Sequence, residues 1–314
     1  MTVDWELYRE LYASSEEPVW GMFPHPSLAR IAARLNVTRN TVWRRMGQWT
    51  ESGFVRGYEV IPHPSLLGVG LGACVVTLPD PRDKPRFLDE LDLVDGVFLA
   101  SYDVGPKVVL VVVTDLPESQ DRRRRSIERL RGVSTVGPTG RVRLPLCRRQ
   151  MSRDEWRLLA ALRQNPSRSI DELATAVGSS TKTVSRRLRA LRRANAMLSH
   201  IVEDFSGFPG TVASYVLRIT PGVDSRVVAR STERRIPGLL EVPRLDVAPR
   251  APAKDLIYWQ EVPTVAAIET SIRQILEVSG IDRVDSYFTG GERAYRGWFD
   301  ERINQAIVGS LARG

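Results

Sequence analysis

The feature that most constrains this chain is a pattern of 20 residues that occurs twice, at residues 27–46 and again at residues 169–188. The two copies align without a gap, 142 positions apart, and their apolar positions coincide. Identical residues stand at six aligned positions: Ser27/Ser169, Ala32/Ala174, Thr41/Thr183, Val42/Val184, Arg44/Arg186 and Arg45/Arg187. Each copy predicts a short helix, a turn and a second, more basic helix, the sequence form of a helix-turn-helix. Two copies in register make DNA binding the leading hypothesis.

The positive charge of the chain is concentrated in the same two regions. The net charge is +8 over 314 residues. Residues 27–56 hold six arginines against one acid, and residues 152–200 hold ten lysines or arginines against four acids. Because the surplus coincides with the repeated pattern, it favours a polyanionic partner such as double-stranded DNA.

Sequence rich in strand formers follows each helical region. Both copies predict the order β-α-β-β-α-β, which is the ferredoxin-like arrangement. The expected ranges are 71–78, 84–93, 96–102, 107–114, 118–131 and 135–146 in the first copy, and 211–219, 223–235, 239–247, 255–262, 263–278 and 282–289 in the second. The helices of such a unit cover one face of its sheet, so the other face needs a partner, most simply the sister unit of the same chain.

Residues 41–60 closely resemble the leucine-responsive regulator/AsnC family of bacterial and archaeal transcription factors. The hallmark run of that family is matched here by Val42, Arg45, Met46 and Gly53, and the Gly-Tyr linker that follows it by Gly57-Tyr58. The resemblance covers almost the whole chain twice, so it implies a fused, tandem version of a regulator. It also implies that the β-α-β-β-α-β units sense a ligand and mediate oligomerisation.

The expected fold class is therefore α+β, with two winged or tri-helical helix-turn-helix domains, each followed by a ferredoxin-like sensor domain. We expect helix-turn-helix domains at 1–62 and 149–204 and sensor domains at 63–148 and 205–314, the last with a C-terminal helix. The two halves should form an intramolecular pseudo-dimer. The resemblance implies that such chains associate further into a homo-oligomer, a dimer or a larger assembly.

The N-terminal half of each second helix carries the candidate DNA contacts. Val42, Met46 and Trp49 recur at helical spacing and should face the core, which leaves the opposite face free for bases and phosphates. The candidate DNA-binding residues are Arg39, Asn40, Thr41, Trp43 and Arg44 in the first copy, and Thr181, Lys182, Ser185, Arg186 and Arg189 in the second. Arg45 and Arg187 occupy an arginine position of the family and are expected to bond within their own domains.

The resemblance also implies a small-molecule effector, an amino acid or another small molecule, and no further cofactor. Sensor domains of the family carry Gly-x-Tyr-Asp between their second and third strands. The aligned residues are Ala100-Ser101-Tyr102-Asp103 in the first copy and Ala253-Lys254-Asp255-Leu256 in the second. The candidate effector-binding residues are Tyr102, Asp103 and Asp255.

Patterns of catalysis and metal binding are not found in the sequence. It contains no nucleophile elbow, HExxH motif or paired carboxylates, so we expect no catalytic residue and no enzymatic function. His25, His63 and His200 have no ligand-like spacing with cysteines or acids, so we expect no metal site.

Two alternatives remain open. Proteins that resemble this family include tetrapyrrole (sirohaem) decarboxylases. Such enzymes need basic residues and histidines around the sensor pocket, whereas neither sensor segment here holds a histidine beyond the linkers, and the positive charge lies on the helices. The second alternative is a weakly specific architectural DNA-binding protein. The N-terminus does not resemble a signal peptide, and the longest apolar stretch, Val108–Val113, is too short to span a bilayer. We therefore expect a cytoplasmic protein with no membrane partner.

Overall fold

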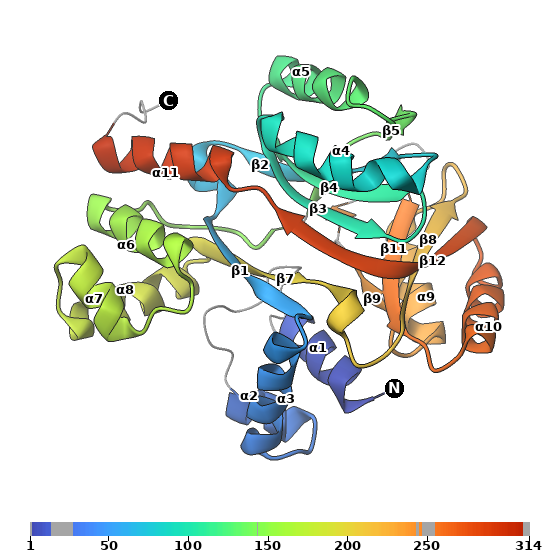
Figure 1. Ribbon diagram of the computed structural model, residues 1–314, viewed down its shortest axis with the longest axis horizontal. Coiled ribbons are helices and arrows are strands. Elements are labelled where there is room, and N and C mark those ends of the chain that lie inside the picture. The colour runs from blue at the N-terminus through green and yellow to red at the C-terminus, as the bar shows by residue number, and fades with distance from the viewer. Residues whose placement is uncertain (1, 14–27, 143, 243–244, 247–254, 310–314) are drawn as a thin grey trace.

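The computed structural model describes residues 2–13, 28–142, 144–242, 245–246 and 255–309. Six helices form the two helix-turn-helices, as the repeated pattern predicted (Figure 1): α1 (Val3–Ala13), α2 (Leu28–Arg34) and α3 (Arg39–Glu51), then α6 (Arg153–Gln164), α7 (Ile170–Val177) and α8 (Thr181–Arg193). The caps of the recognition helices repeat as well. Thr38 accepts a hydrogen bond from the Thr41 amide, and Ser180 accepts one from the Thr183 amide. These side chains satisfy amides that the first helical turn leaves unpaired.

Each recognition helix leads into a linker strand. β1 (Val55–Pro62) and β7 (Met197–Glu203) pair with each other in antiparallel fashion, with Val60 opposite Ser199. The second linker forms its strand although it lacks the Gly-Tyr pair of the first. The resulting two-stranded ribbon runs between the helix-turn-helices and the large sheet (Figure 1).

The two β-α-β-β-α-β units follow the predicted order. The first contains β2 (Gly70–Thr77), α4 (Lys84–Glu90), β3 (Val97–Asp103), β4 (Lys107–Thr114), α5 (Pro117–Glu128), β5 (Thr135–Val136) and β6 (Gly140–Val142). The second contains β8 (Val212–Ile219), α9 (Ser225–Arg235), β9 (Leu240–Glu241), β10 (Leu245–Asp246), β11 (Asp255–Glu261), α10 (Val265–Leu276) and β12 (Ile281–Ala294). The α+β fold class is thus confirmed. The strands expected at 135–146 and 239–247 are each broken into two short pieces.

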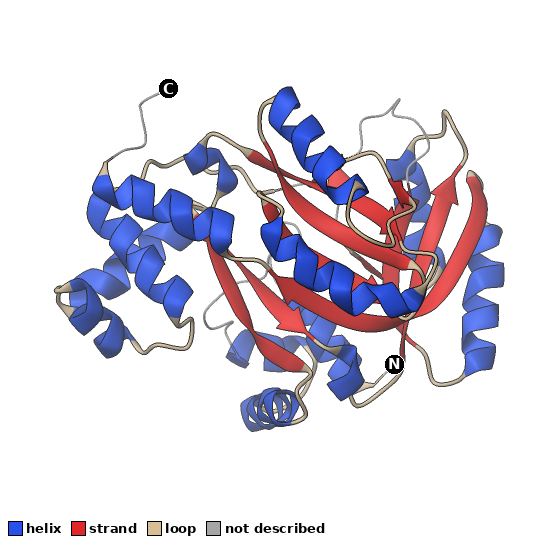
Figure 2. Cartoon of the chain, turned by 45° about the horizontal axis from the view of Figure 1, so that its top comes forward, coloured by secondary structure: helices blue, strands red, loops and turns tan. Residues whose placement is uncertain are grey.

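The sequence of strand β4 is almost entirely apolar, and its position in the sheet explains why. It lies between β2 and β3, and its residues Leu110 to Val113 are all buried. Helices cover one face of the sheet (Figure 2). On the other face, Val111 and Val113 pack with Ile61 and Leu198 of the linker strands and with Phe299 of the C-terminal helix. A strand buried on both faces favours β-branched residues at every position, because no position needs to meet water.

Strand β12 joins the two units and is longer than the sequence predicted. Its first part, up to Phe288, pairs with β8 of its own unit, and its last part, from Thr289, pairs with β3 of the first unit. The register shifts at Gly290, where a Cβ atom would lie 2.8 Å from the ring of Tyr102. A glycine is therefore required at the point where the strand changes partners.

The pairing of β12 with β3, and of β10 with β6, produces one ten-stranded sheet. Nine strands follow the order β10-β6-β2-β4-β3-β12-β8-β11-β9, and the tenth, β5, pairs with β2. Because β9 and β10 are close neighbours in the sequence, the two ends of this order return to the same segment of chain. The inner faces of the two units consequently lie opposite each other, on either side of a common interior. The two units are joined within one chain through the edges of their strands, and side chains of both units line one cavity between them.

The first helix-turn-helix is attached to the second unit by apolar packing. Phe54 lies 5.2 Å from Phe205 and 4.9 Å from Phe208, centroid to centroid. The ring of Phe205 in turn lies 4.9 Å from that of Trp259 on β11. The Trp5 indole nitrogen donates to the Gly238 carbonyl at 2.9 Å.

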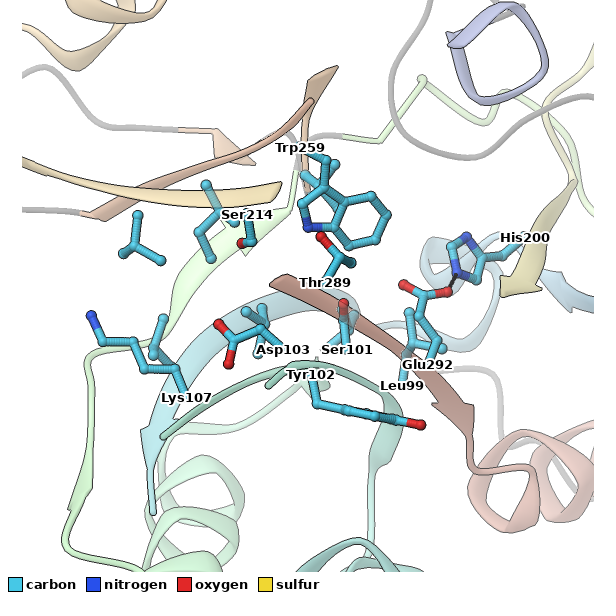
Figure 3. A pocket seen from close by; sticks show the side chains of 16 residues that line it. Leu99, Ser101, Tyr102, Asp103, Lys107, His200, Ser214, Trp259, Thr289 and Glu292 are labelled. Atoms are coloured by element: carbon cyan, nitrogen blue, oxygen red, sulfur yellow. Dashed lines mark hydrogen bonds and ion pairs between the residues drawn. The ribbon is translucent and has the colours of Figure 1, made fainter. Parts of the chain in front are cut away.

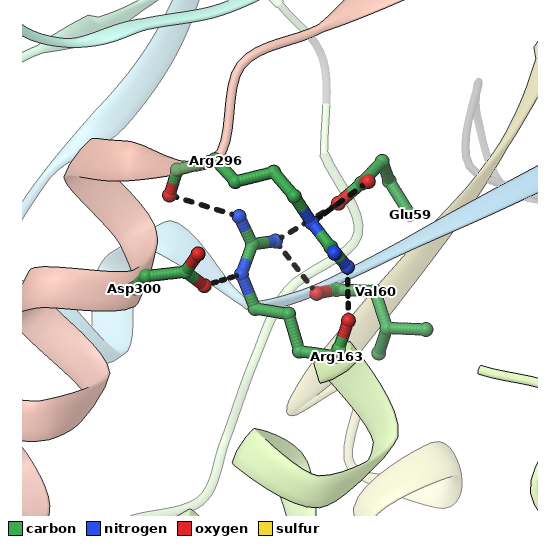
Figure 4. Close-up of polar contacts among 5 residues, drawn as sticks. All are labelled: Glu59, Val60, Arg163, Arg296 and Asp300. Carbon is green, nitrogen blue, oxygen red and sulfur yellow. Dashed lines mark hydrogen bonds and ion pairs between the residues drawn. The ribbon is translucent and has the colours of Figure 1, made fainter. Parts of the chain in front are cut away.

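The second helix-turn-helix is attached through a buried arginine (Figure 4). Arg163, at the end of α6, is 2% exposed and donates to the Val60 carbonyl of β1 at 2.9 Å. It also pairs with Glu59 at 3.2 Å and with Asp300 of the C-terminal helix α11 (Gly297–Val308). Helix α11, which the sequence grouped with the last sensor domain, therefore packs on α6. No helix in the described part of the chain is long and apolar enough to cross a membrane.

Candidate functional site

The first recognition helix exposes most of the side chains that the sequence singled out. Val42 and Trp49 are buried against the domain core. The opposite face carries Trp43, which is 67% exposed, together with the exposed side chains of Arg39, Asn40 and Arg44 and the half-buried Thr41. Large aromatic rings are usually buried in the core. The exposure of Trp43 on a recognition helix therefore suggests that its ring belongs to a contact surface.

The second recognition helix presents the same face with different chemistry. Val184, Leu188 and Leu191 are buried, at the same spacing as in α3. The outer face holds Thr181, Lys182, Arg186 and Arg189, all exposed, and the half-buried Ser185. The structure therefore groups each copy's candidate DNA contacts on one surface.

The arginine that follows each candidate contact has a structural role, as expected. Arg45 pairs with Asp4 of α1 at 2.6 Å, and Arg187 pairs with Asp154 of α6 at 2.8 Å. Each pair ties the recognition helix to the first helix of its own domain. In each copy, therefore, one of two neighbouring arginines pairs within the domain (Arg45 or Arg187), and the other is exposed (Arg44 or Arg186).

A cavity between the two units forms the second candidate site (Figure 3). Apolar walls come from β4, β8 and β11, and polar side chains converge from both units: Ser101, Asp103, Lys107, His200, Ser214, Thr289 and Glu292. The interior volume is about 30 Å³, which is room for about two water molecules. A larger ligand must therefore bind partly outside it.

A groove of about 550 Å³ opens beside this cavity. Tyr102, Asp103 and Glu292 line both spaces, so the predicted effector residues Tyr102 and Asp103 lie at their junction. The groove also carries three cationic side chains, Arg56, Lys84 and Arg293. Arg56 pairs with Asp204, and Arg293 pairs with Asp89. Asp89, Asp103 and Glu292 line the same groove, so its formal charges balance. A carboxylate ligand would have to compete with these acids for the arginines and the lysine.

Asp103 has an unusual environment at this junction. It is 8% exposed, and the Lys84 ammonium lies 3.8 Å from its Oδ1. The same ammonium donates to the carbonyls of Asp103 and Gly105, both at 2.5 Å. Burial raises the pKa of Asp103 to about 6, against the opposing effect of Lys84. The carboxyl can therefore hold a proton close to neutral pH.

A buried set of ionisable side chains borders the cavity on the side of the linker ribbon. His200 Nε2 lies 2.5 Å from Glu292 Oε2, and the Tyr8 hydroxyl of α1 donates to Glu203. Burial raises the pKa of Glu292 to about 8 and that of Glu203 well above its usual range, and it lowers the pKa of His200. His200, Glu203 and Glu292 offer ligand atoms within 4.8 Å of one another, so these three residues could hold a metal ion.

The third predicted effector residue does not align structurally with Asp103. Asp103 ends β3, the second strand of its unit, whereas Asp255 begins β11, the third strand. The counterpart of Asp103 is Asp246, which ends β10. The sequence alignment missed this because the connection after β10 is longer, and Ala253 and Lys254 of the aligned motif lie outside the described residues. The structure describes the backbone of Asp255 alone, so its role stays a prediction.

A signal for this alignment is present in the sequence. Residues 103–107 read Asp-Val-Gly-Pro-Lys, and residues 246–250 read Asp-Val-Ala-Pro-Arg. The sequence analysis also missed His200 and Glu292. No local pattern marks them, because they are 92 residues apart and meet only where β12 passes the end of β7.

Comparisons with known proteins support a regulator-type helix-turn-helix. Residues 151–192 match the model of the AsnC-type helix-turn-helix domain. No curated protein sequence matches the chain.

Three solved structures illustrate the likeness in fold. The siroheme decarboxylase NirDL is 12% identical, with a TM-score of 0.49, over 98% of this chain and 99% of that chain. The transcriptional regulator NMB0573 from Neisseria meningitidis, in complex with L-methionine, is 20% identical over 44% of this chain and 89% of its own, with a TM-score of 0.33. AsnC from Escherichia coli is 18% identical over 48% and 97%, with a TM-score of 0.29.

The expectation that this chain is not an enzyme is corrected by these findings. The structure that is similar over almost the full chain bears the name of an enzyme. The argument against catalysis from the sequence also fails on geometry. His200 belongs to a linker strand, as noted, yet the fold carries its imidazole to the cavity wall.

The resemblance to the leucine-responsive regulator/AsnC family thus has its firmest support in the second half of the chain, where residues 151–192 form an AsnC-type helix-turn-helix domain.

Proposed function

We propose that this protein is a sequence-specific DNA-binding transcriptional regulator in which one chain supplies both halves of a pseudo-dimer. The observation that carries the proposal is the matched exposure of two recognition helices. Arg44 and Arg186 are exposed at equivalent positions, whereas Arg45 and Arg187 beside them are engaged in ion pairs within their domains.

The side chains on these faces suit readout of bases in the major groove. Arginine can contact guanine through two hydrogen bonds, and asparagine can contact adenine in the same way. The first helix offers Arg39, Asn40 and Arg44, whereas the second offers Lys182, Arg186 and Arg189. Because the two faces differ, the operator should consist of two unlike half-sites.

The test begins with selection of bound fragments from genomic DNA, followed by affinity measurements at increasing salt. Phosphate contacts release counterions, so contact with six or more phosphates should cost a factor on the order of 10³ in affinity between about 50 and 200 mM salt. An affinity that does not depend on salt would contradict DNA binding. A small ratio of specific to non-specific affinity would instead identify an architectural DNA-binding protein.

We further propose that the groove beside Tyr102 and Asp103 binds a small anionic effector, and that chains associate into a homo-oligomer. Support for the effector comes from Arg56, Lys84 and Arg293 around the open space. A panel of amino acids and other carboxylates should contain a ligand that changes DNA affinity, and Arg293→Ala should abolish its effect. Sedimentation of the full chain tests the assembly, and a monomer at all concentrations would contradict it.

A second candidate function is decarboxylation of a carboxylate-rich substrate such as a tetrapyrrole. The observation that favours it is Asp103, an acid whose pKa burial raises to about 6, at the end of a groove that Arg56, Lys84 and Arg293 also line. In such a reaction the bond between carbon and the carboxylate breaks, CO₂ leaves, and a proton takes its place on carbon. Asp103 would supply that proton, while groove cations orient the carboxylates of the substrate.

Decarboxylation through Asp103 predicts the direction in which turnover changes with pH. Because Asp103 must be protonated to act, turnover should fall as the pH rises above about 6, and Asp103→Asn should remove the activity. Mixing the protein with an iron tetrapyrrole should also produce a shifted absorbance band. If no tetrapyrrole binds, this candidate is rejected and the regulator remains.

A further inference from the structure

Three buried ionisable side chains meet where the linker ribbon touches the large sheet. His200 and Glu203 lie on β7, and Glu292 lies on β12. A backbone bridge between Asp204 and Gly291 holds the two strands together at this point. His200, Glu203 and Glu292 are 4%, 0% and 3% exposed, and each offers a ligand atom within 4.8 Å of the others. Figure 3 shows His200 and Glu292 pointing toward each other from their separate strands.

The charge of this cluster is poorly compensated by its neighbours. The Tyr8 hydroxyl donates to Oε1 of Glu203, whereas the buried Oε2 receives no N–H or O–H from any residue that the structure describes. The carboxyls of Glu203 and Glu292 can form a hydrogen bond with each other only when one of them holds a proton. Buried carboxylates without compensating partners are costly, and they either take up protons or bind a cation. A cation of charge +2 would neutralise both carboxylates while the imidazole remains neutral.

We propose that His200, Glu203 and Glu292 bind a divalent transition metal ion through one imidazole nitrogen and two carboxylate oxygens. This donor set suits Zn²⁺ and its first-row neighbours, whereas Mg²⁺ and Ca²⁺ prefer oxygen donors alone. Ligand atoms about 2.1 Å from such an ion lie roughly 3.4 Å apart in tetrahedral geometry. The His200 and Glu292 atoms, now 2.5 Å apart, would therefore separate by about 1 Å on binding.

The surroundings complete the description of this metal site. Tyr8 orients the Glu203 carboxylate, as outer-shell partners of metal ligands commonly do. His200 and Glu292 also line the cavity, so the remaining coordination positions face that space and can accept water or an oxygen of a bound ligand. Because Tyr8 belongs to α1, the ion would join the cavity, the linker and the first helix-turn-helix. None of the ligands lies on a recognition helix, so the site adds to the proposed DNA binding and does not depend on it.

The test uses the full chain, stripped with a chelator and then titrated with Co²⁺ and Zn²⁺. We expect one ion per chain by elemental analysis, visible ligand-field bands with Co²⁺, and loss of those bands when Zn²⁺ competes. Because the ion binds the folded state, saturation with Zn²⁺ should raise the thermal midpoint by about 3–6 °C. If the stripped wild-type chain binds neither ion and its midpoint does not move, the cluster is a proton-sharing carboxylate pair and the proposal is wrong.

Matched variants assign the ligands. Glu203→Gln and Glu292→Gln keep side-chain shape and should weaken Co²⁺ binding by more than about 100-fold, whereas Tyr8→Phe should cost about 10- to 100-fold. His63→Gln is the control, because His63 is buried and hydrogen-bonded to Ser65 and Pro145 away from the cluster. Its Co²⁺ binding should match that of the wild type. Should the glutamine variants fail to fold, the wild-type titration decides alone. Equal Co²⁺ affinity in folded Glu203→Gln, Glu292→Gln and wild-type chains would overturn the proposal.

Discussion

The two helix-turn-helices share one sequence pattern but are attached to the rest of the molecule by different sets of contacts. The first is attached by aromatic packing, with Phe54 surrounded by the rings of Phe205, Phe208 and Trp49. The second packs aliphatic side chains on Val60 and Ile303 and adds buried hydrogen bonds and ion pairs centred on Arg163, which reach the linker strand and α11 (Figure 4). The repeated pattern therefore specifies the domain itself and leaves its attachment free to diverge.

The difference has consequences for how each domain can respond to a change in the core. The burial of apolar surface is non-directional, and its stabilising effect declines gradually as contact area is lost. A buried ion pair depends on geometry, and removal of one partner leaves an uncompensated charge. The attachment of the second domain should therefore be the more sensitive to a single substitution.

The largest effect is expected for Arg163→Ala. The change leaves Glu59 buried with only Arg296, at 3.0 Å, to compensate its charge. The attachment should lose about 3–5 kcal/mol, seen as faster hydrogen exchange in α6–α8 and unchanged exchange in α1–α3. The matched control is Arg157→Ala on the same helix. Arg157 is half-exposed and pairs with Asp154 at 4.0 Å, so the loss should stay below about 1 kcal/mol. Equal losses for both variants would contradict the contrast between the domains.

Phe54→Ala tests the attachment of the first domain. Phe54 is 0% exposed, and truncation should cost about 3 kcal/mol through lost contacts and a cavity. Hydrogen exchange should accelerate in α1–α3, while α6–α8 keep their protection. Phe288→Ala, at a ring that is 43% exposed, is the control and should change stability by less than about 0.5 kcal/mol. Loosening of the second domain by Phe54→Ala would show that the two attachments are not independent.

The parts of the molecule that sequence could predict are those set by local contacts. The caps Thr38 and Ser180, and the buried positions Val42 and Val184, depend on neighbours within a few residues, so one pattern identifies them twice. Both β-α-β-β-α-β units were predicted for the same reason, since alternation of strand and helix patterns is visible along the chain.

The parts that sequence did not predict depend on pairings across long separations. The extension of β12 to Ala294 rests on pairing with β3, nearly 200 residues earlier. The approach of His200 to Glu292 requires that same crossing, so no motif could show it. Asp255 was aligned with Asp103 by residue type, whereas the equivalent strand end is Asp246, because the connection that follows is longer in the second unit.

The recognition helices themselves offer a comparison of function. Arg44→Ala and Arg186→Ala should each weaken specific DNA binding by about 1–3 kcal/mol if each arginine contacts a base. Since the two helix faces differ, each variant should relax specificity at a different half-site of the operator. Arg122→Ala, an exposed arginine on α5 of the first unit, is the control and should leave affinity unchanged. Losses that are uniform over all DNA sequences would assign Arg44 and Arg186 to phosphates.

The smallest expected effect is the difference in stability contributed by two ion pairs inside the helix-turn-helix domains, Arg45–Asp4 and Arg187–Asp154. Asp4 is 8% exposed at its side chain and accepts hydrogen bonds from Arg45 at 2.6 Å and from the Trp49 indole at 3.1 Å. Asp154, its counterpart, is 52% exposed and pairs with Arg187 at 2.8 Å. Asp4→Asn should cost about 1–2 kcal/mol, because a buried charged hydrogen bond is weakened, whereas Asp154→Asn should cost less than about 0.5 kcal/mol in water-exposed surroundings. Urea unfolding in low and high salt distinguishes them further, since salt should screen the exposed pair and leave the buried one nearly intact. If both variants lose the same stability, the burial of the first pair has no energetic consequence, and the two domains differ only in how they are attached.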